Sequence, residues 1–169
     1  LYLFAGPVGS GKTTLIHELA KSLFKGQQVM SIEDPVEIKQ EEMLQLQLNE
    51  AIGLTYENLI KLSLRHRPDL LIIGEIRDSE TARAVVRASL TGATVFSTIH
   101  AKSVRGVYER LLELGVTEEE LLCVAASLEK PSEHPLADAI TAEAQARNIP
   151  LAPVEDFLAT PGRGIRGVI

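Results

Sequence analysis

The sequence predicts an α/β fold in which helices cover both faces of a mostly parallel β-sheet. Short apolar runs alternate along the chain with segments whose apolar residues recur at helical spacing. A glycine-rich turn also joins the first apolar run to the first helical segment. Strands and helices that alternate in this way favour a parallel sheet, because each helix carries the chain back to the edge where the next strand begins.

Each element in the first part of the chain has its own local signal. An apolar run that stops at Gly6 is typical of a buried parallel strand, and leucines at helical spacing before Gly26 indicate a helix. Thr55 offers a hydroxyl cap at the start of the next helical segment. These signals predict strands over 1–5, 28–32 and, more exposed, within the Gln- and Glu-rich stretch 38–50, and helices over 12–24 and 56–65.

The alternation continues to Gly115. A very apolar run follows Pro68 and Asp69, and an Ala- and Arg-rich helical segment ends at Gly92. A β-branched run comes next, and the helical segment after it ends at Gly115. We therefore expect strands over 70–73 and 94–98 and helices over 79–90 and 104–114.

The pattern changes beyond Gly115. Thr117, followed by three glutamates, begins a helix that we expect to extend to about Glu129. Prolines then interrupt the chain repeatedly, which breaks the strand–helix alternation. We expect a second helix over 135–147 and two short strands around 162–167, which together form a partial α+β tail segment.

Composition excludes several classes of protein. The 169 residues suffice for a mid-sized domain, and a net charge of −6 disfavours direct binding of nucleic acid as the main activity. A single cysteine, Cys123, excludes an internal disulfide and a multi-cysteine zinc site. No apolar run is long enough to span a bilayer. The first residue is Leu and already lies within a strand pattern, so we expect a piece of a longer protein.

Residues 6–13 read Gly-Pro-Val-Gly-Ser-Gly-Lys-Thr, which fits the phosphate-binding pattern G-x-x-x-x-G-K-[ST] between a strand and a helix. The glycines let successive N–H groups surround an anion, and the helix N-terminus adds its positive end. Lys12 is expected to reach the β- and γ-phosphates of ATP, and Thr13 to help hold Mg²⁺. The alternative is a glycine-rich turn without a ligand. The predicted nucleotide-binding residues are Gly6, Gly9, Ser10, Gly11, Lys12, Thr13 and Thr14.

Acidic residues follow two apolar strands, where ligands bind in open α/β sheets. Glu33, Asp34 and Glu37 follow the second expected strand, and Glu75 follows the most apolar one. An apolar strand that ends in an acid is typical of the Walker B element, which directs Mg²⁺. Solvated loops and helix caps are the alternatives. His100 follows the strand after these, either as a structural histidine or as a sensor of the γ-phosphate; both stay open.

Five ordered blocks carry a family resemblance. They include Ile-Glu-Asp-Pro-Val-Glu (32–37), Ile-Gly-Glu-Ile-Arg-Asp-Ser-Glu-Thr-Ala (73–82) and Leu-Thr-Gly-Ala-Thr-Val-Phe-Ser-Thr-Ile-His-Ala (90–101), besides 6–14 and 64–69. Over residues 1–121 the chain resembles the type II secretion and type IV pilus assembly ATPases, most of all their competence-pilus branch.

The resemblance implies a RecA-like P-loop fold that binds ATP or ADP with Mg²⁺. It implies a homo-hexamer in the cytoplasm, at the inner face of the membrane, which acts on inner-membrane assembly proteins. It assigns phosphate and Mg²⁺ binding to Lys12 and Thr13, catalytic or metal-directed roles to Glu33, Asp34 and Glu37, the Walker B acid to Glu75 and γ-phosphate sensing to His100.

The tail carries a second resemblance. Residues 125–137, with 154–157 and 161–167, resemble part of the nucleotide-binding domain of copper-type P-type ATPases. This implies a possible second nucleotide site, with His134 stacked on adenine, Glu129 near it, and Gly162 and Gly164 beside the nucleotide. The Gly-x-Gly-x-x-Gly pattern alone is weak, because any glycine-rich turn can produce it.

Two domains are therefore predicted, a truncated P-loop ATPase core over 1–121 and a copper-ATPase-like segment over 122–169. An artificial or recombined chimera and a natural fusion are both open. The same holds for function: the chain is predicted to be an ATPase, with a nucleotide-binding fragment of a copper pump and a chimera that binds without turnover as alternatives.

Overall fold

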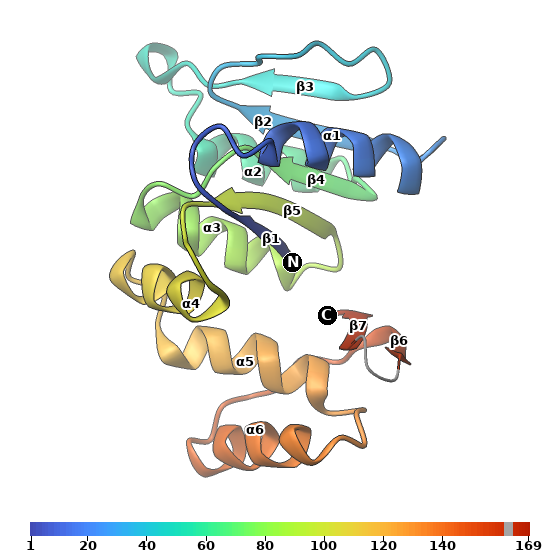
Figure 1. The fold of residues 1–169 in the computed structure, drawn as a ribbon, viewed down its shortest axis with the longest axis vertical. Coiled ribbons are helices and arrows are strands. Elements are labelled where there is room, and N and C mark those ends of the chain that lie inside the picture. Colours follow the sequence, from blue (N-terminus) through green and yellow to red (C-terminus); the bar gives the residue numbers. More distant parts are fainter. Residues whose placement is uncertain (161–163) are drawn as a thin grey trace.

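The computed structural model describes residues 1–160 and 164–169 (Figure 1). Five strands form one sheet, and every adjacent pair is parallel. This confirms the expected α/β class. In spatial order the strands are β1 (Tyr2–Ala5), β5 (Thr94–Ile99), β4 (Leu70–Ile73), β2 (Val29–Glu33) and β3 (Leu44–Gln47).

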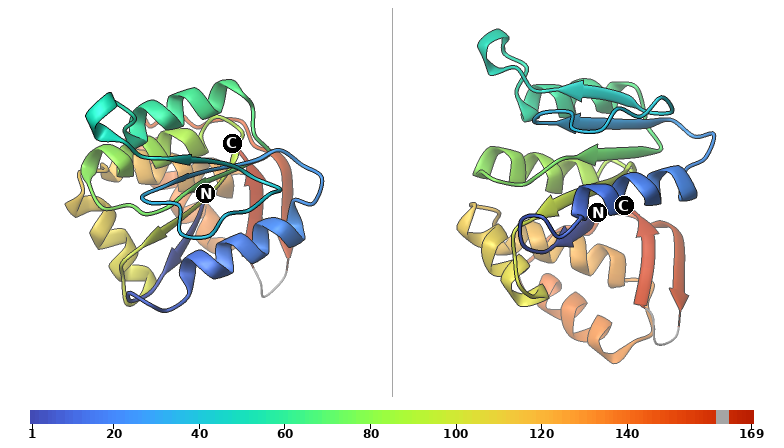
Figure 2. Two further views of the ribbon diagram at one scale, coloured as in Figure 1. Left: turned by 90° about the horizontal axis from the view of Figure 1, so that it is seen from above. Right: turned by 45° about the horizontal axis from the view of Figure 1, so that its top comes forward.

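Helices cover both faces of this sheet, as Figure 2 shows. On one face α1 (Lys12–Leu23) buries Ile16 and Ala20 against Ile72 and Phe96. The larger core on the other face contains side chains from every other strand residue, because successive strand residues point to opposite faces. It is covered by α2 (Tyr56–Arg65), α3 (Ser79–Ser89) and α4 (Val104–Glu113), and a short 3₁₀ helix (Glu50–Ile52) precedes α2.

Side-chain caps explain where these helices begin. The Thr55 hydroxyl accepts a hydrogen bond from the Asn58 backbone N–H at 3.3 Å, which confirms the predicted cap of α2. Asp78 caps α3 by accepting a hydrogen bond from the Thr81 N–H at 2.8 Å. Ser103 caps α4 in the same way.

The tail forms a helical hairpin and a small antiparallel ribbon (Figure 1). Its elements are α5 (Glu118–Glu129), α6 (Pro135–Ala146), β6 (Glu155–Thr160) and β7 (Gly164–Val168). The expectation of two strands around 162–167 was therefore wrong for the first of them, because β6 ends at Thr160 and lies upstream of that range. The ribbon packs closely on α5, since a Cβ at Gly167 would lie 3.0 Å from Leu128 Cδ1.

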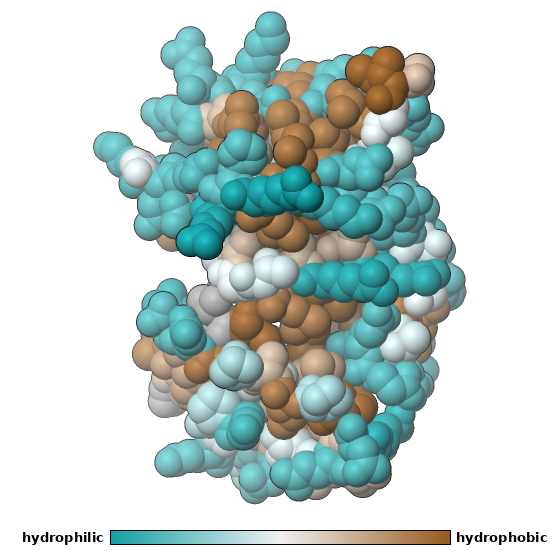
Figure 3. Space-filling model, turned by 180° about the vertical axis from the view of Figure 1, so that it is seen from behind, coloured by the Kyte–Doolittle hydropathy of each residue, from teal (hydrophilic) through white to brown (hydrophobic). Residues whose placement is uncertain are grey.

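Helix α5 crosses the predicted domain boundary at 121/122. Thr117 starts it with a capping box shared with Glu120, and Leu121 and Val124 pack against the core of the large sheet. None of the helices formed by the described residues is both long and apolar enough to cross a membrane. Viewed from behind, the surface mixes hydrophilic and hydrophobic side chains (Figure 3).

Candidate functional site

A cleft of about 550 Å³ opens at the carboxyl ends of the parallel strands. Residues 8–14 of the glycine-rich loop form one wall of it. The predicted catalytic residues Glu33, Asp34, Glu37, Glu75 and His100 all line the same cleft. The structure therefore brings together the loop, the acidic residues and His100, although 92 positions separate Val8 from His100 in the sequence.

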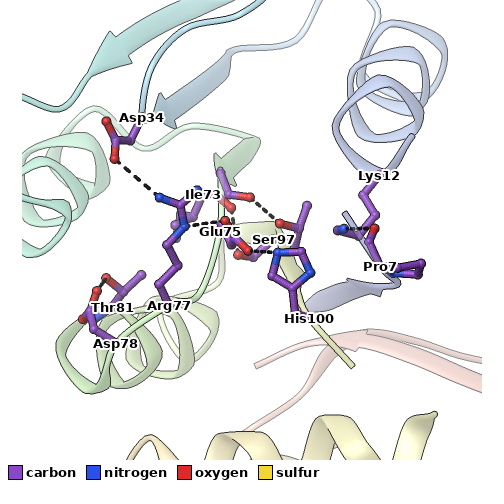
Figure 4. A network of polar contacts seen from close by, with 12 residues as sticks. Pro7, Lys12, Asp34, Ile73, Glu75, Arg77, Asp78, Thr81, Ser97 and His100 are labelled. Carbon is purple, nitrogen blue, oxygen red and sulfur yellow. Dashed lines mark hydrogen bonds and ion pairs between the residues drawn. The ribbon is translucent and has the colours of Figure 1, made fainter. Parts of the chain in front are cut away.

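The loop is built on two glycines with left-handed backbone. Gly9 has φ +75° and Gly11, the N-cap of α1, has φ +81°, a region that disfavours residues with a Cβ. The Ser10 hydroxyl donates to the Pro7 carbonyl at 2.8 Å and tightens the turn. Lys12 Nζ donates to the carbonyls of Gly6 (3.0 Å) and Pro7 (2.8 Å), so its ammonium group lies against the loop (Figure 4). Gly6 thus contributes its carbonyl oxygen as an acceptor for the Lys12 ammonium group.

Glu75 is the centre of a polar network that Figure 4 shows. Its side chain is 14% exposed, and Oε1 forms an ion pair with His100 Nε2 although it makes no regular hydrogen bond among the described residues. Oε2 accepts from Arg77 Nε at 2.5 Å, and Arg77 Nη1 lies 3.8 Å from Asp34 Oδ2. The hydrogen bond to Glu75 raises the pKa of Arg77 further, so the guanidinium keeps its charge.

Backbone hydrogen bonds hold Glu75 in place. The Gly74 N–H donates to the Ile32 carbonyl at 2.8 Å, and the Ile76 N–H donates to the Thr98 carbonyl at 2.9 Å. The segment after β4 thus stays pinned between β2 and β5. His100 Nδ1 lies 3.2 Å from the Gly6 carbonyl, so the histidine joins the loop to Glu75, the predicted Walker B acid. That contact fits the sensing alternative as well as the structural one.

The three acids after β2 have different surroundings. Glu33 is 4% exposed, because it is the last strand residue and its side chain points inward. Its Oε1 accepts from the Ser31 hydroxyl at 2.6 Å and from Gln45 Nε2 at 3.0 Å. Asp34 and Glu37 belong to the following loop and are exposed. Glu33 is therefore the only one of the three that is held rigidly at the cleft.

Sequence reasoning missed four polar residues of this site: His17, Gln45, Tyr56 and Arg77. Burial raises the pKa of Tyr56 to about 12, and the nearby charge of Asp34 acts in the same direction. The signal for Arg77 was its place two residues after Glu75. For Tyr56, His17 and Gln45, no local pattern marks a role, because their neighbours come from other strands and helices.

The residues expected to hold Mg²⁺ fit that ion. Thr13 and Glu75 both line the cleft and offer a hydroxyl and a carboxylate oxygen, the hard ligands that Mg²⁺ prefers. Residues 1–160 and 164–169 contain no cluster of three or more His, Cys, Asp or Glu side chains that could hold a metal. One or two protein ligands are usual where phosphates supply the others. Thr13 and Glu75 would hold the ion, which when bound neutralises phosphate charge.

The possible second nucleotide site in the tail stays a prediction. His134 is the N-cap of α6, and its Nδ1 accepts from the Leu136 N–H at 3.2 Å. Glu129 ends α5, and Gly164 begins β7 with φ +115°. Gly162 lies outside the described residues. The described residues that line the cleft at the sheet include none of the tail.

Residues 1–137 match a family described as "Type II/IV secretion system protein". This span includes the large sheet, all of α5 and the start of α6. The match therefore extends beyond the predicted boundary at 121/122.

Curated relatives agree with the family match. The competence protein ComGA of Streptococcus pneumoniae is 94% identical over 124 residues, which are 73% of this chain and 40% of that protein. The type II secretion system protein E of Xanthomonas campestris is 36% identical over 162 residues, 95% of this chain and 26% of the relative. The chain thus spans less than half the length of these relatives. They give no support to the resemblance between the tail and copper pumps.

Solved structures share the fold. The pilus retraction motor PilT with bound ADP has a TM-score of 0.63 at 24% identity, covering 98% of this chain and 45% of PilT. The VirB11 ATPase of the Brucella suis type IV secretion system, in complex with sulphate, has a TM-score of 0.60 at 21% identity, covering 98% of this chain and 46% of VirB11. At such identities the likeness establishes the RecA-like fold.

Proposed function

Because the chain belongs to the family of type II/IV secretion system proteins, we propose that its cleft binds ATP with Mg²⁺ and forms the catalytic core of a pilus-assembly or secretion motor. One observation carries the proposal: the phosphate loop and a buried carboxylate, Glu33, line the same cleft as Glu75 and His100. A phosphate cradle alone would explain binding, whereas the added carboxylates supply what hydrolysis needs.

Each group has a distinct task in the proposed reaction. Lys12 and the loop amides neutralise charge on the β- and γ-phosphates, and Thr13 with Glu75 would hold Mg²⁺. Water attacks the γ-phosphorus, the bond from phosphorus to the β–γ bridging oxygen breaks, and the proton of the water passes to a carboxylate. Glu33 suits that acceptor role, because donors fix its carboxylate at the cleft wall. His100 links the phosphate loop to Glu75 and is placed to respond to the γ-phosphate.

The wider setting is also a proposal. ComGA is named a competence protein and PilT a pilus retraction motor, so we assign this chain to a motor of a DNA-uptake pilus. Such a motor would be a hexameric ring at the cytoplasmic face of the membrane that acts on membrane assembly proteins. In this proposal the chain supplies the large sheet and the cleft of one subunit.

Nucleotide titration tests where ATP binds. Lys12→Ala should weaken the affinity for Mg²⁺-ATP about 10- to 100-fold, the effect of losing charge-assisted hydrogen bonds of about 1.5–3 kcal/mol. Lys21→Ala is the matched control, because Lys21 lies on the same helix but pairs with Glu18 on the surface. Unchanged affinity in Lys12→Ala would contradict the proposal. If His134→Gln then abolished that binding, the nucleotide would belong to the tail.

Turnover is tested separately by phosphate release in the presence of Mg²⁺. Glu75→Gln and Glu33→Gln should bind ATP and lose hydrolysis, because each keeps the shape of the side chain and removes its charge. A parent chain that binds ATP in the cleft without releasing phosphate would favour the alternative of binding without turnover.

A further inference from the structure

His17 is a buried histidine that the proposed reaction does not use. It lies in α1, one turn after the phosphate loop, and is 2% exposed. Its Nε2 lies 3.7 Å from Glu33 Oε1 and has no hydrogen-bond partner among the described residues. Buried polar atoms are nearly always paired, so an unpaired ring nitrogen aimed at a buried carboxylate calls for a functional explanation.

The other ring nitrogen of His17 lies near an amide group. Gln40 Nε2 lies 3.5 Å from His17 Nδ1, and an amide NH₂ group can only donate. The contact is compatible with the tautomer in which Nδ1 accepts and the proton lies on Nε2, facing Glu33. The Gln40 backbone N–H also donates to Gln45 Oε1 at 2.7 Å. This hydrogen bond joins the loop that contains Gln40 to β3.

Gln45 holds the same carboxylate from another strand. Its Oε1 accepts from a backbone N–H, and its Nε2 donates to the Ile38 carbonyl at 2.9 Å as well as to Glu33 Oε1. These partners allow only one orientation of the amide. The alternation of β3 places Gln45 and Gln47 on the same face, and Gln47 Oε1 accepts from the Val36 N–H at 3.1 Å. The glutamines of this edge strand therefore anchor the loop that follows Glu33.

We propose that His17 and Gln45 are positioning residues that hold Glu33 by Oε1 and leave Oε2 for the attacking water. Ser31 and Gln45 both donate hydrogen bonds to Oε1, and His17 Nε2 lies 3.7 Å from the same oxygen. A carboxylate that accepts two hydrogen bonds on one oxygen, with a buried imidazole packed beside that oxygen, cannot rotate freely, so the direction of its second oxygen is restricted. This inference rests on the proposed hydrolytic function. The tautomer of His17 that it requires can be measured independently of that function.

The first test measures that tautomer without nucleotide. In the chain labelled with ¹⁵N-histidine, long-range ¹H–¹⁵N correlation should show the Nε2–H tautomer of His17. Its signals are identified by replacing the exposed histidines His66, His100 and His134 one at a time. Glu33→Gln should move the signals of His17 and leave those of His66 unchanged. An Nδ1–H tautomer would overturn the inference, whatever the chain does with ATP.

The second test separates positioning from binding. His17→Phe should lower the single-turnover rate of ATP hydrolysis about 10- to 100-fold, the cost of misplacing a catalytic group by about 1 Å, with ATP affinity within about twofold of the parent. His17→Gln, which restores an N–H donor, should recover part of the rate, and His66→Phe should leave it unchanged. Rates equal to the parent in a folded His17→Phe chain would overturn the inference.

The inference can still be tested if His17→Phe does not fold, or if the parent chain does not hydrolyse ATP. If His17→Phe does not fold, Gln45→Leu on the edge strand replaces it and should lower the rate in the same way; an unchanged rate there overturns the inference. If the parent binds ATP but does not hydrolyse it, the proposed turnover fails and the tautomer measurement alone decides between support and rejection.

Discussion

Replacing Tyr56 by Phe should change how stability responds to alkaline pH. Tyr56 begins α2, lines the cleft and has a pKa raised to about 12, first by burial and then by the charge of Asp34. An unfolded tyrosine ionises near pH 10. Between these values the unfolded chain has lost the proton and the folded chain has kept it, so the free energy of unfolding falls as pH rises.

The size of the effect follows from the shift. A pKa shift of two units corresponds to about 2.7 kcal/mol in the free energy of unfolding. Because the ring is only partly buried, we expect about half of that contribution. This contribution is fully present below pH 10 and is lost as pH rises through about 12. Tyr56→Phe has no proton to lose. Its stability relative to the parent should therefore increase by about 1–1.5 kcal/mol between pH 9 and pH 12, as measured by urea unfolding.

Absorbance gives an independent reading of the same group. The chain has three tyrosines and no tryptophan, so tyrosinate absorbance reports tyrosines alone. A component that titrates near pH 12 should be present in the parent and in Tyr108→Phe, and absent in Tyr56→Phe. If the late component survives in Tyr56→Phe, or if both chains lose stability equally above pH 10, the reasoning about Tyr56 is refuted.

Three further predictions concern stability and are checked by urea unfolding. Ile73→Ala should lower the free energy of unfolding by about 2–5 kcal/mol, because Ile73 is fully buried. Val104→Ala should change it little, because Val104 is 88% exposed. Equal effects of the two substitutions would contradict the described core. Thr117→Ala should cost about 1 kcal/mol by removing the capping box of α5, and no loss would mean that the box does not form in solution. Gly11→Ala should cost about 1 kcal/mol or more because of its φ of +81°, and a neutral result would indicate another loop conformation.

The sequence predicted best those elements whose signals are local. The helix over 56–65 and the strand over 70–73 were predicted to the residue. The first has a hydroxyl cap at Thr55, and the second is a purely apolar run after a proline. The ribbon of the tail was placed less well, because Glu-Asp-Phe-Leu-Ala-Thr in β6 lacks a clear alternation and is largely exposed.

The candidate site likewise contains residues with a local sequence signal and residues whose roles depend on the tertiary structure. The phosphate loop is one contiguous pattern and needed no tertiary information. Burial distinguishes Glu33 from Asp34 and Glu37, and burial depends on where β2 ends and which way its last side chain points. The roles of His17 and Gln45 depend on β2 and β3 being neighbours, and sequence order alone does not specify that β3 takes the edge position. Contacts of this kind become visible only when strand order is known.

Helix α5 packs against both the large sheet and the ribbon of the tail. Its first turns pack Leu121 and Val124 against the core of that sheet, while Leu128 near its end faces Gly167 of the ribbon. A helix forms cooperatively, so a division at 121/122 would remove the capped first turn from the rest of α5. The predicted boundary at 121/122 would therefore divide one continuous helix. The two parts are then physically coupled through α5, whatever the origin of the tail.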